Sequence, residues 1–218
     1  GNPDRARTAM QSVMEHLVDR RLGLIRLFTP PFDSAEADPG YIKGYVPGVR
    51  ENGGQYTHAA VWVAMAYAAL RDADKAWELF QILNPIRHGD TRERADVYKI
   101  EPYVVAADIY AAAGREGAGG WSWYTGSAAW LYQLLVEGLL GIRIEGDLLS
   151  FAPLFPADWT EFKLTYRYRN TFYHIGVKKA GPETWNVQHV WLDGVEQPDQ
   201  KIHMVDDGQK REAFVEVG

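Results

Sequence analysis

The hydrophobic pattern of this chain changes its period once, near residue 141. Before that point, apart from a loop over residues 24–56 that follows no period, apolar residues recur at intervals of three and four, which predicts helices. After it they alternate with polar residues, as in the run FKLTYRYRNTFYHIGVKK that begins at Phe162, which predicts strands. We therefore expect a helical domain over residues 1–141 and a small antiparallel β-domain over residues 142–218.

Helices are predicted over residues 3–20, 57–70, 73–83, 102–113 and 128–139. Pro3 suits a first turn, and Thr57 and Asp72 are the expected N-caps. The runs AAVWVAMAYAAL and YVVAADIYAAA are apolar almost all round, which is typical of helices in the inner ring of a layered α/α barrel. Five such helices cannot close a barrel, so we expect a missing N-terminal barrel half, or self-association, to cover their faces.

Composition narrows the classes of function. The net charge is -6 and the basic residues are scattered, which argues against nucleic acid as a partner. There is no cysteine, which excludes disulfides and suits a reducing compartment, so the cytoplasm is the expected location. His88, His174, His189 and His203 lack the spacing of metal ligands, so neither a metal nor a resident cofactor is expected. The apolar runs are too short for direct membrane insertion.

Two polar stretches rich in glycine lead into the starts of predicted helices. They read GVRENGGQYTHAA, from Gly48 to Ala60, and GREGAGGWSWYTGSA, from Gly114 to Ala128. Each is either a polar turn with a well-made cap or one wall of a binding site. The eight tryptophans and twelve tyrosines are likewise open to two interpretations, core packing or surfaces on which sugars stack.

These stretches carry a family resemblance. The segments GYVPGVRENGGQYTHAAVWVAMAYAAL, YKIEPYVVAADIY and GGWSWYTGSAAWLYQLLVEGLLGI resemble the C-terminal region of inverting glycoside phosphorylases of glycoside hydrolase family 94. Within that family they are most similar to the phosphorylase-like domain of cyclic β-1,2-glucan synthases. The resemblance implies an (α/α)6 barrel followed by a jelly-roll-like β-sandwich. In a full-length synthase this segment would lie at the cytoplasmic face of the inner membrane.

The resemblance also implies a reaction and a phosphate site. Enzymes of this family are carbohydrate-active phosphorylases that cleave a β-glucosidic bond with inorganic phosphate as co-substrate. His58, Thr125 and Gly126 match the positions that hold phosphate in the family. Their chemistry suits an anion, because an imidazole, a hydroxyl and a backbone N–H at a helix start all donate hydrogen bonds.

Sugar contacts are implied at further positions. Glu51 matches the acid that contacts the acceptor-side sugar, and Glu101 stands where related enzymes have glutamine against the donor sugar. The other candidates are neighbours in the two motifs, namely Arg50, Gln55, Tyr56, Trp123 and Tyr124. Asp108 follows an apolar run and is expected to bond within the helical domain rather than to act as an acid.

The general acid of the family lies in a DWND-like motif upstream of the histidine motif, and no such motif occurs here. We therefore predict a fragment of a β-glucan phosphorylase or cyclic glucan synthase, with no catalytic residue of its own and no activity in isolation. The alternative is a β-glucan-binding or structural module that performs no catalysis.

Overall fold

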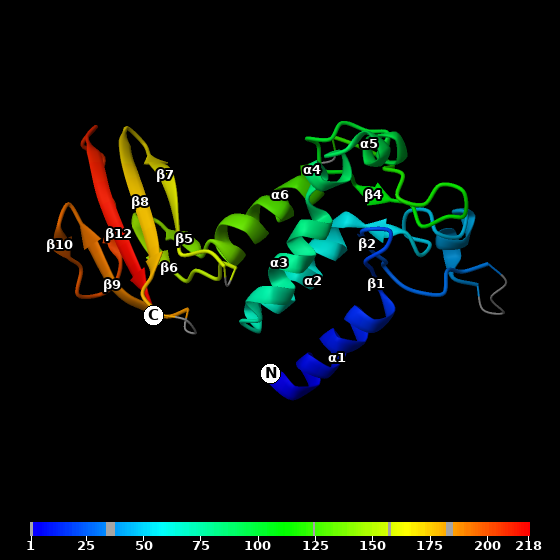
Figure 1. The fold of residues 1–218 in the computed structure, drawn as a ribbon, viewed down its shortest axis with the longest axis horizontal. Coiled ribbons are helices and arrows are strands. Elements are labelled where there is room, and N and C mark those ends of the chain that lie inside the picture. The colour runs from blue at the N-terminus through cyan, green and yellow to red at the C-terminus, as the bar shows by residue number, and fades with distance from the viewer. Residues whose placement is uncertain (1, 34–37, 124, 157, 182–184) are drawn as a thin grey trace. The chain divides into compact units, whose positions relative to one another are not determined.

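The computed structural model describes residues 2–33, 38–123, 125–156, 158–181 and 185–218. The chain divides into two compact units, unit 1 comprising Gly1–Leu134 and unit 2 comprising Leu135–Gly218. Helices and short strand pairs make up unit 1, and two larger sheets make up most of unit 2 (Figure 1). The fold is therefore of the mixed α plus β class that the sequence predicts. The domain boundary expected at residues 141 and 142 stays a prediction.

Unit 1 is built on three helices that pack together. Helix α2 contacts α3 on one side and α6 on another (Figure 1). The helices of the unit are α1 (Pro3–His16), α2 (Thr57–Ala69), α3 (Ala73–Leu83), α4 (Pro85–His88), α5 (Arg92–Tyr98), α6 (Thr125–Gln133) and the 3-10 helix η1 (Gly40–Gly44). Its strands form two short antiparallel pairs, β1 (Val18–Asp19) with β2 (Leu24–Ile25) and β3 (Gln55–Tyr56) with β4 (Asp108–Ile109).

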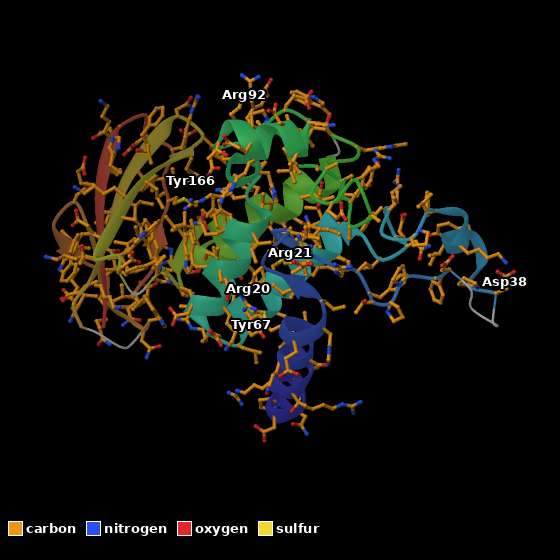
Figure 2. The ribbon with its side chains drawn as sticks, turned by 45° about the vertical axis from the view of Figure 1, so that its right-hand side comes forward. Arg20, Arg21, Asp38, Tyr67, Arg92 and Tyr166 are labelled. Atoms are coloured by element: carbon orange, nitrogen blue, oxygen red, sulfur yellow. The ribbon has the colours of Figure 1, made fainter. Side chains whose placement is uncertain are left out.

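Helix α1 begins where the sequence predicts and ends earlier. Pro3 occupies the first turn, and the Asn2 side chain accepts hydrogen bonds from the next backbone N–H groups. The helix ends at His16 instead of residue 20, because Val18 and Asp19 turn back to pair with β2. The hydroxyl of Tyr67, labelled in Figure 2, donates to the carbonyl of Met10 at 2.8 Å and ties α1 to α2.

Of the two predicted N-caps, that of α3 is confirmed and that of α2 is wrong. Asp72 caps α3 as expected, since its carboxylate accepts from the N–H of Lys75. Thr57 was expected to cap α2 and instead lies inside it. The N-cap position belongs to Tyr56. Thr57 is buried, and its hydroxyl accepts a hydrogen bond from the Gln55 amide at 3.1 Å.

The helix predicted over residues 102–113 is wrong. This segment is extended around β4, and its backbone hydrogen bonds go to neighbouring loops. An apolar run of this length fits a buried strand as well as a buried helix, and periodicity alone does not separate the two. One of the two apolar helices from which the inner ring of an α/α barrel was inferred is therefore not a helix.

Helix α6 begins at Thr125, three residues before its predicted start, and a π-helical stretch over Leu134–Leu139 continues it. Helices α4 and α5, which the sequence interpretation missed, are short and carry clear caps in Asn84 and Thr91. No helix in the described part of the chain is both long enough and apolar enough to cross a membrane.

Unit 2 contains a sheet of five strands in the order β10-β9-β12-β8-β7 and a sheet of three in the order β11-β6-β5 (Figure 1). The strands are β5 (Ile142–Glu145), β6 (Leu148–Phe151), β7 (Glu161–Tyr168), β8 (Thr171–Lys179), β9 (Val187–Leu192), β10 (Val195–Glu196), β11 (Ile202–His203) and β12 (Lys210–Val217). They cover the predicted strand runs. Buried apolar side chains from both sheets, such as Leu149, Ile175 and Val215, form the core.

One strand pair departs from the antiparallel arrangement expected of this domain. Strand β12 runs parallel to β8 along its whole length and antiparallel to β9. A parallel pair needs a crossover connection. Here the chain between β8 and β12 supplies it, and that segment includes β9, β10 and β11.

Candidate functional site

The two glycine-rich stretches meet on either side of one extended segment. We name residues 48–56 the first glycine loop and residues 114–123 the second glycine loop. On one side of residues 107–111, Ala111 donates to the carbonyl of Gly48, and Ala107 accepts from Thr57. On the other side, Ala107 donates to the carbonyl of Trp121 at 2.7 Å, and Gly120 donates to that of Asp108 at 2.9 Å. The extended segment therefore holds the two loops in a fixed relation.

Several glycines of the two loops leave no room for a side chain, and Gly53 and Gly120 are two of them. Gly53 has a φ of +81°, which disfavours residues with a side chain, and a Cβ on it would lie 2.9 Å from Pro31 Cβ. A Cβ on Gly120 would lie 2.4 Å from both carboxylate oxygens of Asp108. The double glycine of the first loop thus lets that loop pack on Pro31, while Gly120 makes room for a buried carboxylate.

Two buried amides fix the first glycine loop from within. Asn52 is fully buried and donates to the carbonyls of Phe32 and Tyr45, both at 2.8 Å, while its Oδ1 accepts from the N–H of Phe32 at 2.7 Å. Gln55 is also buried, and its Oε1 accepts from the N–H of Ile25 at 2.8 Å. Both amides hold the backbone in place, so Gln55, a predicted sugar contact, has its polar atoms bound within the fold.

A charged cluster lies where the two loops meet. The guanidinium of Arg50 is 3.6 Å from the carboxylate of Glu51, and its central carbon is 4.4 Å from the centre of the Trp121 ring. Asp108, only 1% exposed, accepts from the N–H of Trp121 at 3.0 Å. Arg50 Nε, Glu51 Oε2 and Asp108 Oδ2 are buried and have no hydrogen-bond partner within the described chain. Buried polar atoms without partners are rare and mark places where a ligand or water completes the bonding.

Burial raises the pKa of Asp108 above its ordinary value of 3.8. The N–H of Trp121 and the charge of Arg50 act against this rise, and the charge of Glu51 adds to it. The cluster is thus a set of two acids and one base whose charges are coupled at the junction of the two loops.

His58 lies on the first turn of α2 and approaches the start of α6. A Cβ placed on Gly126 would be only 3.7 Å from His58 Nδ1. The imidazole ring of His58 packs against the rings of Trp62 and Trp130, whose centroids lie 4.7 Å and 5.6 Å away. Nε2 of His58 is buried and unpartnered among the described residues. The imidazole is therefore held rigidly by aromatic rings, with one nitrogen near a helix N-terminus and the other lacking a bond.

Glu101 and Trp123 form a second polar contact. The indole N–H of Trp123 donates to Glu101 Oε1 at 2.9 Å, and this bond holds the pKa of Glu101 below its ordinary range. Trp123 is 70% exposed, so its ring is free to meet a ligand. The pair joins the segment before β4 to the second glycine loop.

The structure thus brings His58 close to Gly126, Arg50 close to Glu51, and Glu101 close to Trp123. Tyr56 packs its ring on His58, with centroids 6.2 Å apart. Tyr124 lies outside the described residues, and Thr125 is described only as the first residue of α6.

The sequence interpretation missed one residue of the site, Trp130, and did not foresee where Asp108 lies. Trp130 contacts His58 from α6, and Asp108 belongs to the charged cluster. Asp108 bonds inside unit 1 as expected, but its position beside Arg50 could not be foreseen while its segment was assigned to a helix.

The arrangement suits an anion beside a ligand that has hydroxyl groups and a flat apolar face. A helix N-terminus with an adjacent imidazole attracts phosphate or carboxylate. A carboxylate such as Glu51 can accept two hydroxyl hydrogen bonds, and exposed tryptophans offer flat apolar surfaces. No group of three or more acidic or histidine side chains in the described ranges is arranged to hold a metal ion.

Comparison with known proteins agrees with this class of site. Residues 1–141 match the family model described as glycosyl hydrolase 94 superfamily, catalytic domain. The match extends over more than half of the sequence, so the chain belongs to the glycosyl hydrolase 94 superfamily, as its motifs indicated.

The relatives are carbohydrate-active enzymes. The chain is 51% identical over 179 residues to the cyclic beta-(1,2)-glucan synthase NdvB of Rhizobium meliloti, covering 82% of this chain and 6% of that protein. It is 31% identical over 192 residues to an N,N'-diacetylchitobiose phosphorylase of Vibrio furnissii, covering 87% of this chain and 23% of that protein. A 1,2-beta-oligoglucan phosphorylase of Listeria innocua is 32% identical over 124 residues, or 50% of this chain and 11% of the relative. The chain therefore spans less than a quarter of the length of each of these relatives.

Proposed function

We propose that the chain supplies phosphate- and sugar-binding residues to an inverting phosphorylase domain that acts on β-glucans. The observation that carries the proposal is the approach of His58 to Gly126 at the start of α6. His58, Thr125 and Gly126 would bind inorganic phosphate, the co-substrate, and no resident cofactor takes part. Phosphate bound there would be held by an imidazole and by the N–H end of a helix.

The charged cluster and the exposed rings supply the sugar side of the proposal. Glu51, oriented by Arg50, would accept hydroxyl hydrogen bonds from the acceptor-side sugar. Glu101 and Trp123 would contact the donor sugar, with the fixed indole as a stacking surface. Inversion requires the nucleophile and the general acid on opposite faces of the sugar. In this proposal the acid comes from residues outside these 218.

The same proposal accounts for the apolar faces of unit 1. Trp62 on α2 is 52% exposed, and Tyr132 on α6 is 67% exposed. We propose that these helices belong to an (α/α)6 barrel whose other half, or a second copy of the chain, covers them. Unit 2 would be the jelly-roll-like domain that follows the barrel, and the assembly would act in the cytoplasm.

A calorimetric titration of the chain tests the proposal. Inorganic phosphate should bind with measurable heat, and His58→Ala should abolish that heat. His88→Ala is the matched control, because His88 is a half-buried histidine of unit 1 whose ring stacks on Tyr98 and whose Nε2 lies 2.9 Å from the carbonyl oxygen of Ile82. Phosphate binding that His58→Ala leaves unchanged would contradict the proposal. If the chain binds short β-1,2-glucans but shows no binding of phosphate, a module that only binds glucan would be favoured instead.

A further inference from the structure

The five-stranded sheet of unit 2 has one buried face and one open face. Tyr173, Ile175 and Val177 of β8 are buried, so His174 and Gly176 between them point to the open face. The pairing register places Phe214 of β12 beside Gly176 and Trp191 of β9 beside Phe214. An aromatic pair and a glycine therefore stand in one row across the sheet.

A hollow of about 810 Å³ lies on the open face around Gly176. This volume is within the range of small-molecule sites. One side is aromatic, with the rings of Trp191 and Phe214 at 5.5 Å between centroids. The other side is polar, where Thr165 Oγ1 and His174 Nδ1 lie 3.0 Å apart and Glu212 is paired with His174 in the strand register.

Gly176 has no conformational reason to be glycine. Glycine inside a strand weakens it and often marks a bulge, a tight bend or a place where a ligand or another backbone comes close. The register of β8 with β7 and with β12 runs without interruption through Gly176, so there is no bulge. Its φ is not positive, and a Cβ there would meet only Phe214 Cδ2, at an ordinary 3.7 Å. Apart from its chain neighbours, no backbone atom of the described residues lies within 4 Å of such a Cβ, so we attribute the glycine to the close approach of a ligand.

The lining identifies the class of ligand. Lys163 and Glu212 contribute opposite charges to the hollow, so it has no strong preference for an anion or a cation. Aromatic rings beside donors and acceptors suit a molecule with apolar C–H faces and many hydroxyls. We propose that the hollow around Gly176 binds a neutral gluco-oligosaccharide and is a second carbohydrate site, formed wholly by unit 2. The choice of glucose as the sugar rests on the proposed function, whereas the hollow itself does not.

The proposal is tested by titrating the whole chain with short β-1,2-glucans in phosphate-free buffer. Trp191→Ala removes half of the aromatic side and should weaken binding about tenfold or more. Gly176→Val fills the floor and should weaken it by at least as much. Valine is favoured in strands, so this variant should melt at the same temperature as the parent or higher. Loss of binding without loss of stability separates a ligand site from a packing role.

Phe172→Ala is the matched control, since Phe172 lies on the same sheet, is 37% exposed and does not line the hollow. It should bind glucan like the parent. The proposal is overturned if glucan does not bind, or if Trp191→Ala and Gly176→Val bind it unchanged. It is also overturned if Gly176→Val only converts a dimer to a monomer in sedimentation, because a second copy then fills the hollow. Failure of the proposed function would appear separately, as phosphate binding that does not depend on His58.

Discussion

Among single residues, Asn52 holds the first glycine loop in shape. Its amide makes three hydrogen bonds to the backbone of Phe32 and Tyr45. We expect Asn52→Ala to lower the free energy of unfolding of unit 1 by about 2–4 kcal/mol, because it leaves three partly buried backbone groups without partners. Urea unfolding measures this loss. Asn186→Ala is the control, since that residue is exposed, and an equal effect of the two substitutions would refute the assignment.

The raised pKa of Asp108 predicts how the stability of the chain depends on pH. Burial raises its pKa in the folded chain above the ordinary 3.8, so the folded state binds the proton more tightly than the unfolded state. Its contribution to stability is therefore most favourable at low pH and declines as pH rises from 3.8 through the folded pKa. We expect the stability of Asp108→Asn, relative to the parent, to increase over that window and then level off. Unfolding by urea at a series of pH values measures it.

Asp19 is the control for this prediction, because its pKa is shifted in the opposite direction. Burial acts to raise its pKa, but the hydrogen bonds from Leu22 and Arg26 outweigh burial and lower it. Its stabilising contribution is present above 3.8 and declines as pH falls through the folded pKa. Asp19→Asn should therefore lose stability relative to the parent as pH rises. The same slope for both variants would contradict the assignment of Asp108.

At the scale of elements, the extended segment around β4 is the central finding. Its alanine-rich sequence suits a helix locally, yet it pairs with the first glycine loop on one side and with the second on the other. The first glycine loop is distant in sequence, so no local pattern could reveal that pairing, whereas the second glycine loop follows the segment directly. The helices 57–70 and 73–83 were predictable because their periodicity and stop signals are local. The nearness of His58 to Gly126 followed from the family motifs, whereas the charge interaction of Asp108 with Arg50 depended on the unforeseen segment.

The packing of this segment is testable at Gly120. A Cβ there would collide with the carboxylate of Asp108, so Gly120→Ala should destabilise unit 1 by about 1–3 kcal/mol. In a double-mutant cycle, the cost of Gly120→Ala should fall when Asp108 is replaced by alanine. Gly44→Ala is the control, because a Cβ at Gly44 meets nothing within 4 Å. Additive costs at Gly120 and Asp108 would rule out the collision as the cause.

At the scale of the whole molecule, the proposal assigns only one wall of a catalytic site to this chain. We expect the purified chain to release no glucose 1-phosphate from β-1,2-glucan and phosphate, because no general acid is assigned to it. A coupled assay for glucose 1-phosphate checks this. Release that is abolished by His58→Ala would contradict the expected inactivity.

The central claim is that phosphate binds between His58 and the start of α6. The most direct measurement follows the backbone amide of Gly126 by two-dimensional NMR as inorganic phosphate is added. We predict a saturable shift of the Gly126 signal that disappears in His58→Ala, while Gly194 in unit 2 stays in place. A Gly126 signal that moves no more than that of Gly194 would contradict the claim.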